Sequence, residues 1–175
     1  MDPNVINILK YVKSKSNFYK NTKLQESFIR KYSKYLDLNC VVTYYQMSES
    51  FYHDFQDKLN WSYISENLDL EESFIRTFAH RVDWNWICYE QRHLSESFIR
   101  EFADKVDWYC VSKNQILSES FIIEFADKVD WENISSFQKL SEAFIIKFKD
   151  RVNWHWISVY QSISENFIET YGDKL

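Results

Sequence analysis

Residues 94–131 read LSESFIREFADKVDWYCVSKNQI followed by LSESFIIEFADKVDW, so a phrase of 23 residues ends and immediately begins again. The apolar residue that opens the phrase recurs along the chain, at Leu24, Met47, Leu70, Leu94, Leu117, Leu140 and Ile163. The steps between these residues are 23, 23, 24, 23, 23 and 23. A fixed period in the range of about 20–50 residues is typical of a solenoid, in which each repeat buries its apolar face against its neighbours.

The first half of each repeat carries the pattern of a helix. In one repeat, Ser95 is followed by the apolar residues Phe98, Ile99, Phe102 and Val106. Ser is a preferred helix N-cap, because its hydroxyl accepts a hydrogen bond from an otherwise unpaired backbone N–H. The spacing of the apolar residues is that of one helix face and differs from the alternation of a strand. The pattern therefore predicts a capped helix of about 11 residues.

The second half predicts another, shorter helix. Asp107 stands where a second N-cap is needed, and Trp108, Val111 and Gln115 then share one face of a helix of about 8 residues. We expect the tryptophan to be a buried core residue. The glutamine is polar at a regular and partly inward position, so we expect it to bind backbone groups between helices. Helices this short are marginal alone in water, and stacking has to stabilise them.

The repeats run from end to end, which predicts a single all-α domain, residues 1–175: a solenoid of stacked two-helix repeats of about 23 residues each. Residues 1–23 fit a degenerate N-terminal capping repeat whose first helix is capped by Asp2. Six repeats follow over residues 24–162. Residues 163–175 form a C-terminal half repeat.

The pattern LSExFIxxFxDKVDWxxISxxQ, over residues 24–175, resembles tandem repeats in proteins of giant, mimivirus-like DNA viruses that infect amoebae. The resemblance implies a repeat protein of viral origin, and it implies no particular activity. The chain departs from the pattern at Leu38 in place of Trp, Glu71 in place of Ser, and His80 in place of Asp, and it has one extra residue near His93. These departures predict local irregularity in two repeats within the same fold.

Composition excludes several classes of protein. One Gly and one Pro in 175 residues exclude Gly-rich phosphate loops and turn-rich all-β folds. No apolar run reaches the ~18 residues of a membrane span, so we expect no membrane association. Three cysteines at no motif spacing fit reduced thiols of an intracellular protein. We expect a cytoplasmic protein, in the cytoplasm of a host cell if the chain is viral as the resemblance implies.

No sequence motif for catalysis is present. The chain lacks a phosphate-binding loop, a nucleophile elbow, a zinc-protease helix and a paired CxxC motif. Its many carboxylates fall at repeat positions that capping and the helix dipole already explain. We therefore expect a protein that is not an enzyme, with no catalytic residue, no metal site, no cofactor and no small-molecule substrate.

The candidate functional residues are those that change from repeat to repeat on the flank of the second helix. Tyr and Trp are the residue types that most often anchor protein interfaces. The aromatic members of this flank form the predicted partner-binding strip: Tyr63, Trp86, Tyr89, Phe137, Trp156 and Tyr160. The first hypothesis is a scaffold that binds a protein or peptide, with a host protein as its target if the chain is viral. The alternative is that these aromatics pack on the second helix of the next repeat.

Two other functions stay open. Residues 1–46 carry a net charge of +5, although the whole chain carries −5. Lys10, Lys13 and Lys20 alternate there with tyrosines, a weak form of the pattern that binds nucleic acid or phosphate. The acidic balance of the chain argues against a nucleic-acid partner, and these lysines also fit a solvated capping repeat. The last hypothesis is a self-assembling structural protein, against which the polar C-terminal repeat argues.

Overall fold

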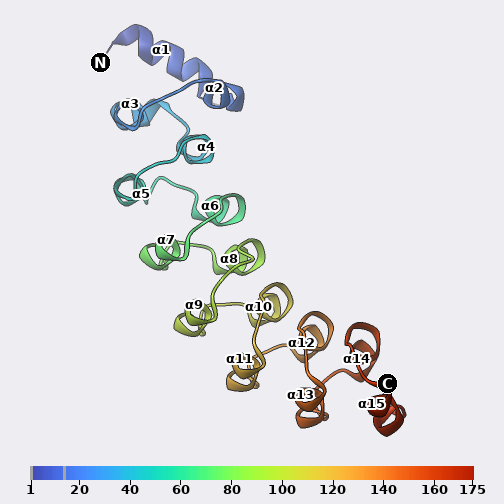
Figure 1. Cartoon of the computed structure of the whole chain (residues 1–175). Helices are drawn as coiled ribbons and strands as arrows, with labels where there is room; N and C mark the ends of the chain where they lie inside the picture. The colour runs from blue at the N-terminus through green and yellow to red at the C-terminus, as the bar shows by residue number, and fades with distance from the viewer. Residues whose placement is uncertain (1, 14) are drawn as a thin grey trace. The chain divides into compact units, whose positions relative to one another are not determined.

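The computed structural model describes residues 2–13 and 15–175, and within them all regular secondary structure is helical (Figure 1). This confirms the expected all-α fold of two-helix repeats. The seven opening residues define repeats 1 to 7, and the opening residue is position 1 of each repeat. Contacts group the chain into two compact units, Met1–Asp83 and Trp84–Leu175, and the boundary falls inside repeat 3. None of the helices in the described part of the chain is long and apolar enough to cross a membrane.

The first unit holds the N-terminal helices, repeats 1 and 2 and the first helix of repeat 3. Its helices are α1 (Pro3–Val12), α2 (Ser16–Asn21), α3 (Glu26–Tyr32), the 3-10 helix η1 (Ser33–Tyr35), α4 (Leu38–Tyr44), α5 (Glu49–Phe55), α6 (Trp61–Asn67) and α7 (Glu72–Thr77). The expected cap at Asp2 is present, because its carboxylate accepts a hydrogen bond of 2.8 Å from the backbone N–H of Asn4. Second helices α4 and α6 lie in contact, as stacked repeats require.

The second unit holds repeats 4 to 7 and the second helix of repeat 3. Its helices are α8 (Trp84–Glu90), α9 (Glu96–Glu101), α10 (Trp108–Asn114), α11 (Glu119–Glu124), α12 (Trp131–Phe137), α13 (Glu142–Lys147), α14 (Trp154–Tyr160) and α15 (Glu165–Tyr171). The second helices α8, α10, α12 and α14 pack side by side in one row, and α9, α11, α13 and α15 form the other (Figure 1).

The core of the second unit is formed by apolar residues from both rows. Those with no exposed surface are Ile87, Phe98, Ile99, Val111, Phe121, Ile122, Ile134, Ile145 and Ile157. They occupy the apolar positions that the repeat pattern assigns to the inner face of each helix. Burial of such side chains stabilises the fold by roughly 1.5–3 kcal/mol each, which the separate short helices could not supply.

The predicted caps are present in the structure. The Ser95 hydroxyl accepts a hydrogen bond of 3.2 Å from the backbone N–H of Phe98. The Asp107 carboxylate accepts a hydrogen bond of 2.8 Å from the backbone N–H of Tyr109. At Glu71, where the pattern loses its Ser, the helix starts without a side-chain cap. This departure is thus local, as the sequence indicates.

The first helix of each repeat is shorter than expected. Helix α9 ends at Glu101, because Phe102 leaves the helical region with φ −112° and ψ 26°. A turn follows, closed by a hydrogen bond of 2.8 Å from the Lys105 N–H to the Phe102 carbonyl. The change of direction lets the carbonyl of Ala103 accept a hydrogen bond of 3.0 Å from Nε1 of Trp108. A contact between the two halves of the repeat therefore accompanies the turn that ends the first helix.

The tryptophan of each repeat packs against the first helix of the next repeat. The Trp108 ring lies 6.2 Å from the ring centre of Phe121 and 4.8 Å from that of Phe125. The ammonium group of Lys128 lies over the Trp108 ring at 5.9 Å. Trp108 is nevertheless only half-buried, so the prediction of a buried core residue is wrong at this position.

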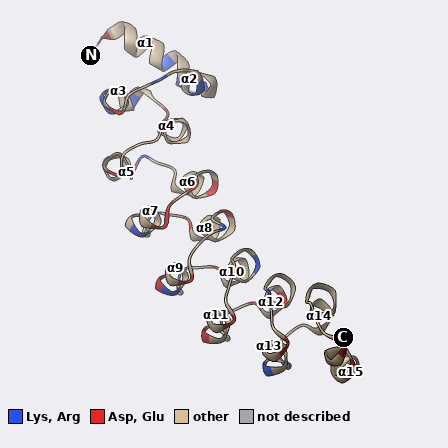
Figure 2. Ribbon diagram, in the orientation of Figure 1, with Lys and Arg blue, Asp and Glu red and all other residues tan. Residues whose placement is uncertain are grey.

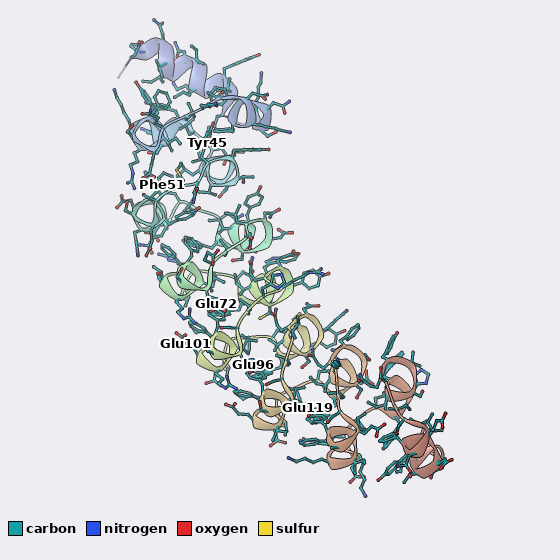
Figure 3. All side chains as sticks on the ribbon, viewed as in Figure 1. Tyr45, Phe51, Glu72, Glu96, Glu101 and Glu119 are labelled. Carbon is teal, nitrogen blue, oxygen red and sulfur yellow. The ribbon has the colours of Figure 1, made fainter. Side chains whose placement is uncertain are left out.

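Polar hydrogen bonds join consecutive repeats as well. Nε2 of Gln138 donates to the carbonyls of Ser112 and Gln115 at 2.8 Å each, and its Oε1 accepts from the Leu117 N–H at 3.0 Å. This confirms the expected role of the glutamine. The first-turn glutamates have a role that the sequence did not indicate. The carboxylate of Glu96, labelled in Figure 3, accepts a hydrogen bond of 2.6 Å from the backbone N–H of the next capping serine.

Candidate binding surface on the second helices

The row of second helices in the second unit exposes large aromatic side chains. Tyr89 of α8 is 51% exposed, Phe137 of α12 is 56% exposed and Tyr160 of α14 is 58% exposed. All three are residues of the predicted strip. The four helices of the row carry only three charged side chains: Glu90, Lys113 and Glu132. Figure 2 shows the contrast between uncharged α14 and the charged first helices α11 and α13.

Two tryptophans of the predicted strip stand beside these tyrosines. Trp86 and Trp156 are half-buried. The Trp86 ring meets Tyr89 edge-on with 6.2 Å between ring centres, and the Trp156 ring stacks on Tyr160 at 5.6 Å. Each pair comes from one helix, α8 or α14. The aromatic residues of these helices therefore support one another, and each pair keeps one member largely open to solvent.

A surface hollow of about 350 Å³ lies beside the first pair, lined by Asn85, Trp86, Tyr89 and Cys110. Its residues come from the neighbouring helices α8 and α10. Burial, together with the nearby carboxylate of Asp107, raises the pKa of the Cys110 thiol, so this group stays neutral at physiological pH. The hollow thus offers an uncharged, largely aromatic lining to a partner side chain.

One cation lies among the aromatic rings. Nζ of Lys113 is 5.9 Å from the ring centre of Tyr109 and 5.8 Å from that of Phe137. Tyr109 is 53% exposed and was not among the predicted residues. Tyr109 is at position 16, which is not one of the recurring apolar positions of the repeat. A large aromatic residue at such a position is the sequence signal that would have identified it. We call these nine residues the aromatic surface: Asn85, Trp86, Tyr89, Tyr109, Cys110, Lys113, Phe137, Trp156 and Tyr160.

Position 17 is not equally open in every repeat. Asn133 occupies it in α12 and is only 6% exposed, whereas Trp86 and Trp156 occupy it half-buried. Nδ2 of Asn133 is the one buried side-chain N or O atom in the described part of the chain without a hydrogen-bond partner. The surface therefore has a buried polar position between its aromatic pairs.

Tyr63, the remaining residue of the predicted strip, belongs to the first unit. It lies half-buried in α6, and its hydroxyl is 3.1 Å from Oγ1 of Thr43 in α4. This contact is packing on a neighbouring second helix, as in the alternative interpretation, although the neighbour belongs to the preceding repeat and not to the next one. Tyr63 therefore contributes to stacking in the first unit, and its aromatic face is less open than those of Tyr89 and Tyr160.

The three predicted basic residues are all exposed, but the structure does not gather them at one place. Nζ of Lys10 lies over the Tyr35 ring at 5.9 Å. Lys13 lines a hollow of about 550 Å³ together with Lys34 and Lys58, and residues Ser33, Leu36, Asp37, Leu38 and Asn39 complete it. Lys20 is not part of this lining. The hollow thus combines three lysines with one carboxylate.

The two surfaces differ in chemistry: the second unit offers aromatic rings with one lysine, and the first unit offers a mixed hollow with three lysines. The described residues of both surfaces lie on helices or on the turns that join them. Comparison of the chain with family models, with curated proteins and with solved structures finds no match in any of the three.

Proposed function

We propose that the chain is a non-enzymatic interaction scaffold that binds a protein or peptide through the aromatic surface. The observation that carries the proposal is the exposure of Tyr89, Phe137 and Tyr160, each more than half open on a row of helices with few charges. Aromatic side chains contribute most of the binding energy at many protein interfaces, and clustered exposed apolar groups mark such sites.

The geometry favours a partner with an apolar anchor and a nearby acceptor. The hollow beside Trp86 and Tyr89 has room for one apolar side chain. Lys113, between the rings of Tyr109 and Phe137, can pair with a carboxylate at the rim of the interface. The resemblance of the repeats to those of amoebal viruses makes a host protein the partner to test first. The cytoplasm is the proposed site, since its reducing conditions suit the three free cysteines.

The test compares capture of proteins from amoebal lysate by two matched triple variants. Tyr89→Ser with Phe137→Ser and Tyr160→Ser removes the exposed rings of the aromatic surface. Ile123→Ser with Ile146→Ser and Ile168→Ser removes exposed apolar groups from the first-helix row of the same unit, where each is 40–47% exposed. Exposed positions tolerate such changes within about 0.5 kcal/mol each, so both variants should fold. We expect the first variant to lose the wild-type partner and the second to keep it; the reverse result would refute the proposal.

A second candidate function has one observation in its favour, the hollow that Lys13, Lys34 and Lys58 share. Three ammonium groups around a hollow can bind phosphate groups, in agreement with the net charge of residues 1–46. The presence of Asp37 in the lining and the acidic balance of the chain weigh against it. Retention on heparin that falls with salt, and that Lys13→Ala with Lys34→Ala abolishes, would favour this function over the first.

A further inference from the structure

Position 22 differs between the two units. It carries Gln in repeats 3 to 6 and other residues in the first two repeats: Tyr45, Leu68, Gln91, Gln115, Gln138 and Gln161. The amide of Gln138 provides two donors and one acceptor, and all three are used by backbone groups at 2.8–3.0 Å. Gln161 repeats the arrangement at 2.8–3.1 Å. Leu68 occupies the same place, also with an extended backbone, but its side chain has no polar atom.

Counting positions in the repeat identifies the backbone groups in repeat 2 that have no glutamine amide to bind, because Leu68 stands in place of the glutamine. Gln138 binds the carbonyls at positions 19 and 22 of the preceding repeat and the N–H at position 1 of its own. In repeat 2 the corresponding groups are the carbonyls of Val42 and Tyr45 and the N–H of Met47. These three groups hydrogen bond to no other residue in the described part of the chain.

A hollow lies at this place. It has a volume of about 390 Å³, and its lining includes Val42, Tyr45, Met47 and Leu68. Figure 3 labels Tyr45, the residue that follows helix α4. The hydroxyl of Tyr45 is directed elsewhere, to the carbonyls of Tyr19 and Thr22 at 2.8 and 2.7 Å, so only its backbone is available to the hollow.

A buried polar side chain also lines the hollow. Tyr52 is 8% exposed, and its hydroxyl forms no hydrogen bond with the described residues. Other repeats have Ile at this position, as in Ile99 and Ile122, so the hydroxyl is an addition of repeat 2. The hydroxyl oxygen itself is not fully buried, because Nδ2 of Asn133 is the one such side-chain atom without a partner in the described part of the chain, so this hydroxyl can bond to a polar group in the hollow.

We propose that this hollow binds a primary carboxamide, the side chain of a glutamine in a partner polypeptide. The two amide hydrogens would bind the carbonyls of Val42 and Tyr45, and the amide oxygen would bind the N–H of Met47, as Gln138 does within the chain. Tyr52 adds a second donor for the same oxygen. The site lies in the first unit and does not depend on the aromatic surface proposed above.

The set of backbone groups fits neither of the charged side chains of similar size, although the carboxylates of Asp69 and Glu71, which also line the hollow, would attract an ammonium group. A carboxylate would bring its oxygens against two carbonyl oxygens, which repel it. An ammonium group could donate to both carbonyls but could not accept from the N–H of Met47. Of these three side chains, only the carboxamide supplies two donors and an acceptor on one planar group, so a glutamine is preferred to Glu or Lys.

The experiment uses three small probes of nearly equal size: propionamide, propionate and propylammonium. Each is titrated into the whole ¹⁵N-labelled chain while the backbone amide resonances of Met47 and Leu117 are followed by NMR. We expect a saturable shift of the Met47 resonance with propionamide alone, at concentrations up to about 100 mM, since so small a ligand can bind only weakly. Leu117 should not shift, because Gln138 already occupies its site.

The matched variant is Leu68→Gln, which places the chain's own amide in the hollow. We expect it to abolish the propionamide shift, to raise the melting temperature and to leave capture by the aromatic surface unchanged. The proposal is overturned if propionate or propylammonium shifts Met47 as much as propionamide does, or if no probe shifts it. It is also overturned if propionamide still shifts Met47 in a folded Leu68→Gln variant. The three-probe comparison in the wild type decides the matter even if that variant does not fold.

Discussion

Cys88 occupies a position where the other repeats of the second unit have serine. In repeats 4 and 5, the hydroxyls of Ser112 and Ser135 each accept a hydrogen bond of 2.9 Å. The donor is the backbone N–H of the residue that caps the second helix of the next repeat, Asp130 or Asn153. Sγ of Cys88 accepts the corresponding bond from the N–H of Asp107 at 3.4 Å. Burial raises the pKa of the Cys88 thiol to about 12, so the thiol stays protonated and poorly reactive.

This pKa predicts how stability depends on pH. The ordinary pKa of a cysteine is 9.0, about 3 units below the folded value. The contribution of Cys88 is therefore complete below about pH 9 and is lost as pH rises toward 12, by about 1.4 kcal/mol for each pH unit. Urea unfolding of the wild type and of Cys88→Ser at pH 7, 8.5 and 10 measures it. We expect the wild type to lose stability relative to the variant with rising pH; a constant difference would contradict the burial of the thiol.

The candidate residues could be predicted from sequence only in part, and position 17 illustrates the reason. Trp86, Asn133 and Trp156 share this position in the pattern, but Asn133 is buried and the tryptophans are half open. Exposure depends on which side chains the neighbouring helices carry, and the repeat period does not contain that information. The loss of Gln at Leu68, in contrast, is visible in the aligned repeats, although its consequence appears only with the backbone groups in place.

At the scale of helices, the starts were more predictable than the ends. A helix start depends on one residue and its nearest backbone groups, so Ser95 and Asp107 are sufficient to mark it. The end of α9 is followed by a turn in which the Ala103 carbonyl accepts a hydrogen bond from Trp108, five residues further along the chain. The apolar periodicity continues to Val106, and periodicity alone therefore gives a helix that is too long.

The glutamine at position 22 is expected to be a strong link between neighbouring helices. Gln138→Leu would leave two carbonyls and one N–H without their partners, and the glutamine that binds them is only 5% exposed. Unsatisfied buried groups cost about 1–3 kcal/mol each, and partial relaxation suggests a total loss of about 2–4 kcal/mol. Urea unfolding measures the change. The control is Lys139→Leu at the next, exposed residue, which should change stability by less than about 0.5 kcal/mol. Equal effects of the two substitutions would show that the amide adds nothing.

Across the second unit, the same classes of contact recur from repeat to repeat. Nζ of Lys128 lies 2.9 Å from the carboxylate of Asp104, and the Arg151 guanidinium lies 2.8 Å from that of Asp127. Both pairs join position 12 to position 11 of the preceding repeat. Together with the tryptophan and glutamine contacts, they make the junctions between repeats 4, 5 and 6 similar in chemistry. The period of the sequence predicts this similarity, because the residues that form these contacts recur at the same positions.

Similar junctions predict that a whole repeat can be removed. Deleting residues 117–139 joins Ile116 to Leu140 and keeps the register. Trp108 would then meet Phe144 and Phe148, which take the places of Phe121 and Phe125 in the next repeat: Trp131 already packs on them with 6.2 and 4.9 Å between ring centres. The amide of Gln161 would bind the carbonyls that Gln138 binds now. Each contact that is lost is thus replaced by one of the same kind.

Removing only part of the repeat should have a different result. Deleting residues 117–129 takes away α11 and its turn but keeps α12, so Trp108 would have no first helix to pack against and two second helices would follow each other directly. We expect the whole-repeat deletion to keep the helical circular dichroism per residue and a single cooperative urea transition, with less total stability because one interface is gone. The partial deletion should lose helicity and cooperativity. If both shortened chains lose helicity and cooperativity to the same extent, the contacts between repeats are not interchangeable. Stability would then have to come from contacts that are specific to individual repeats.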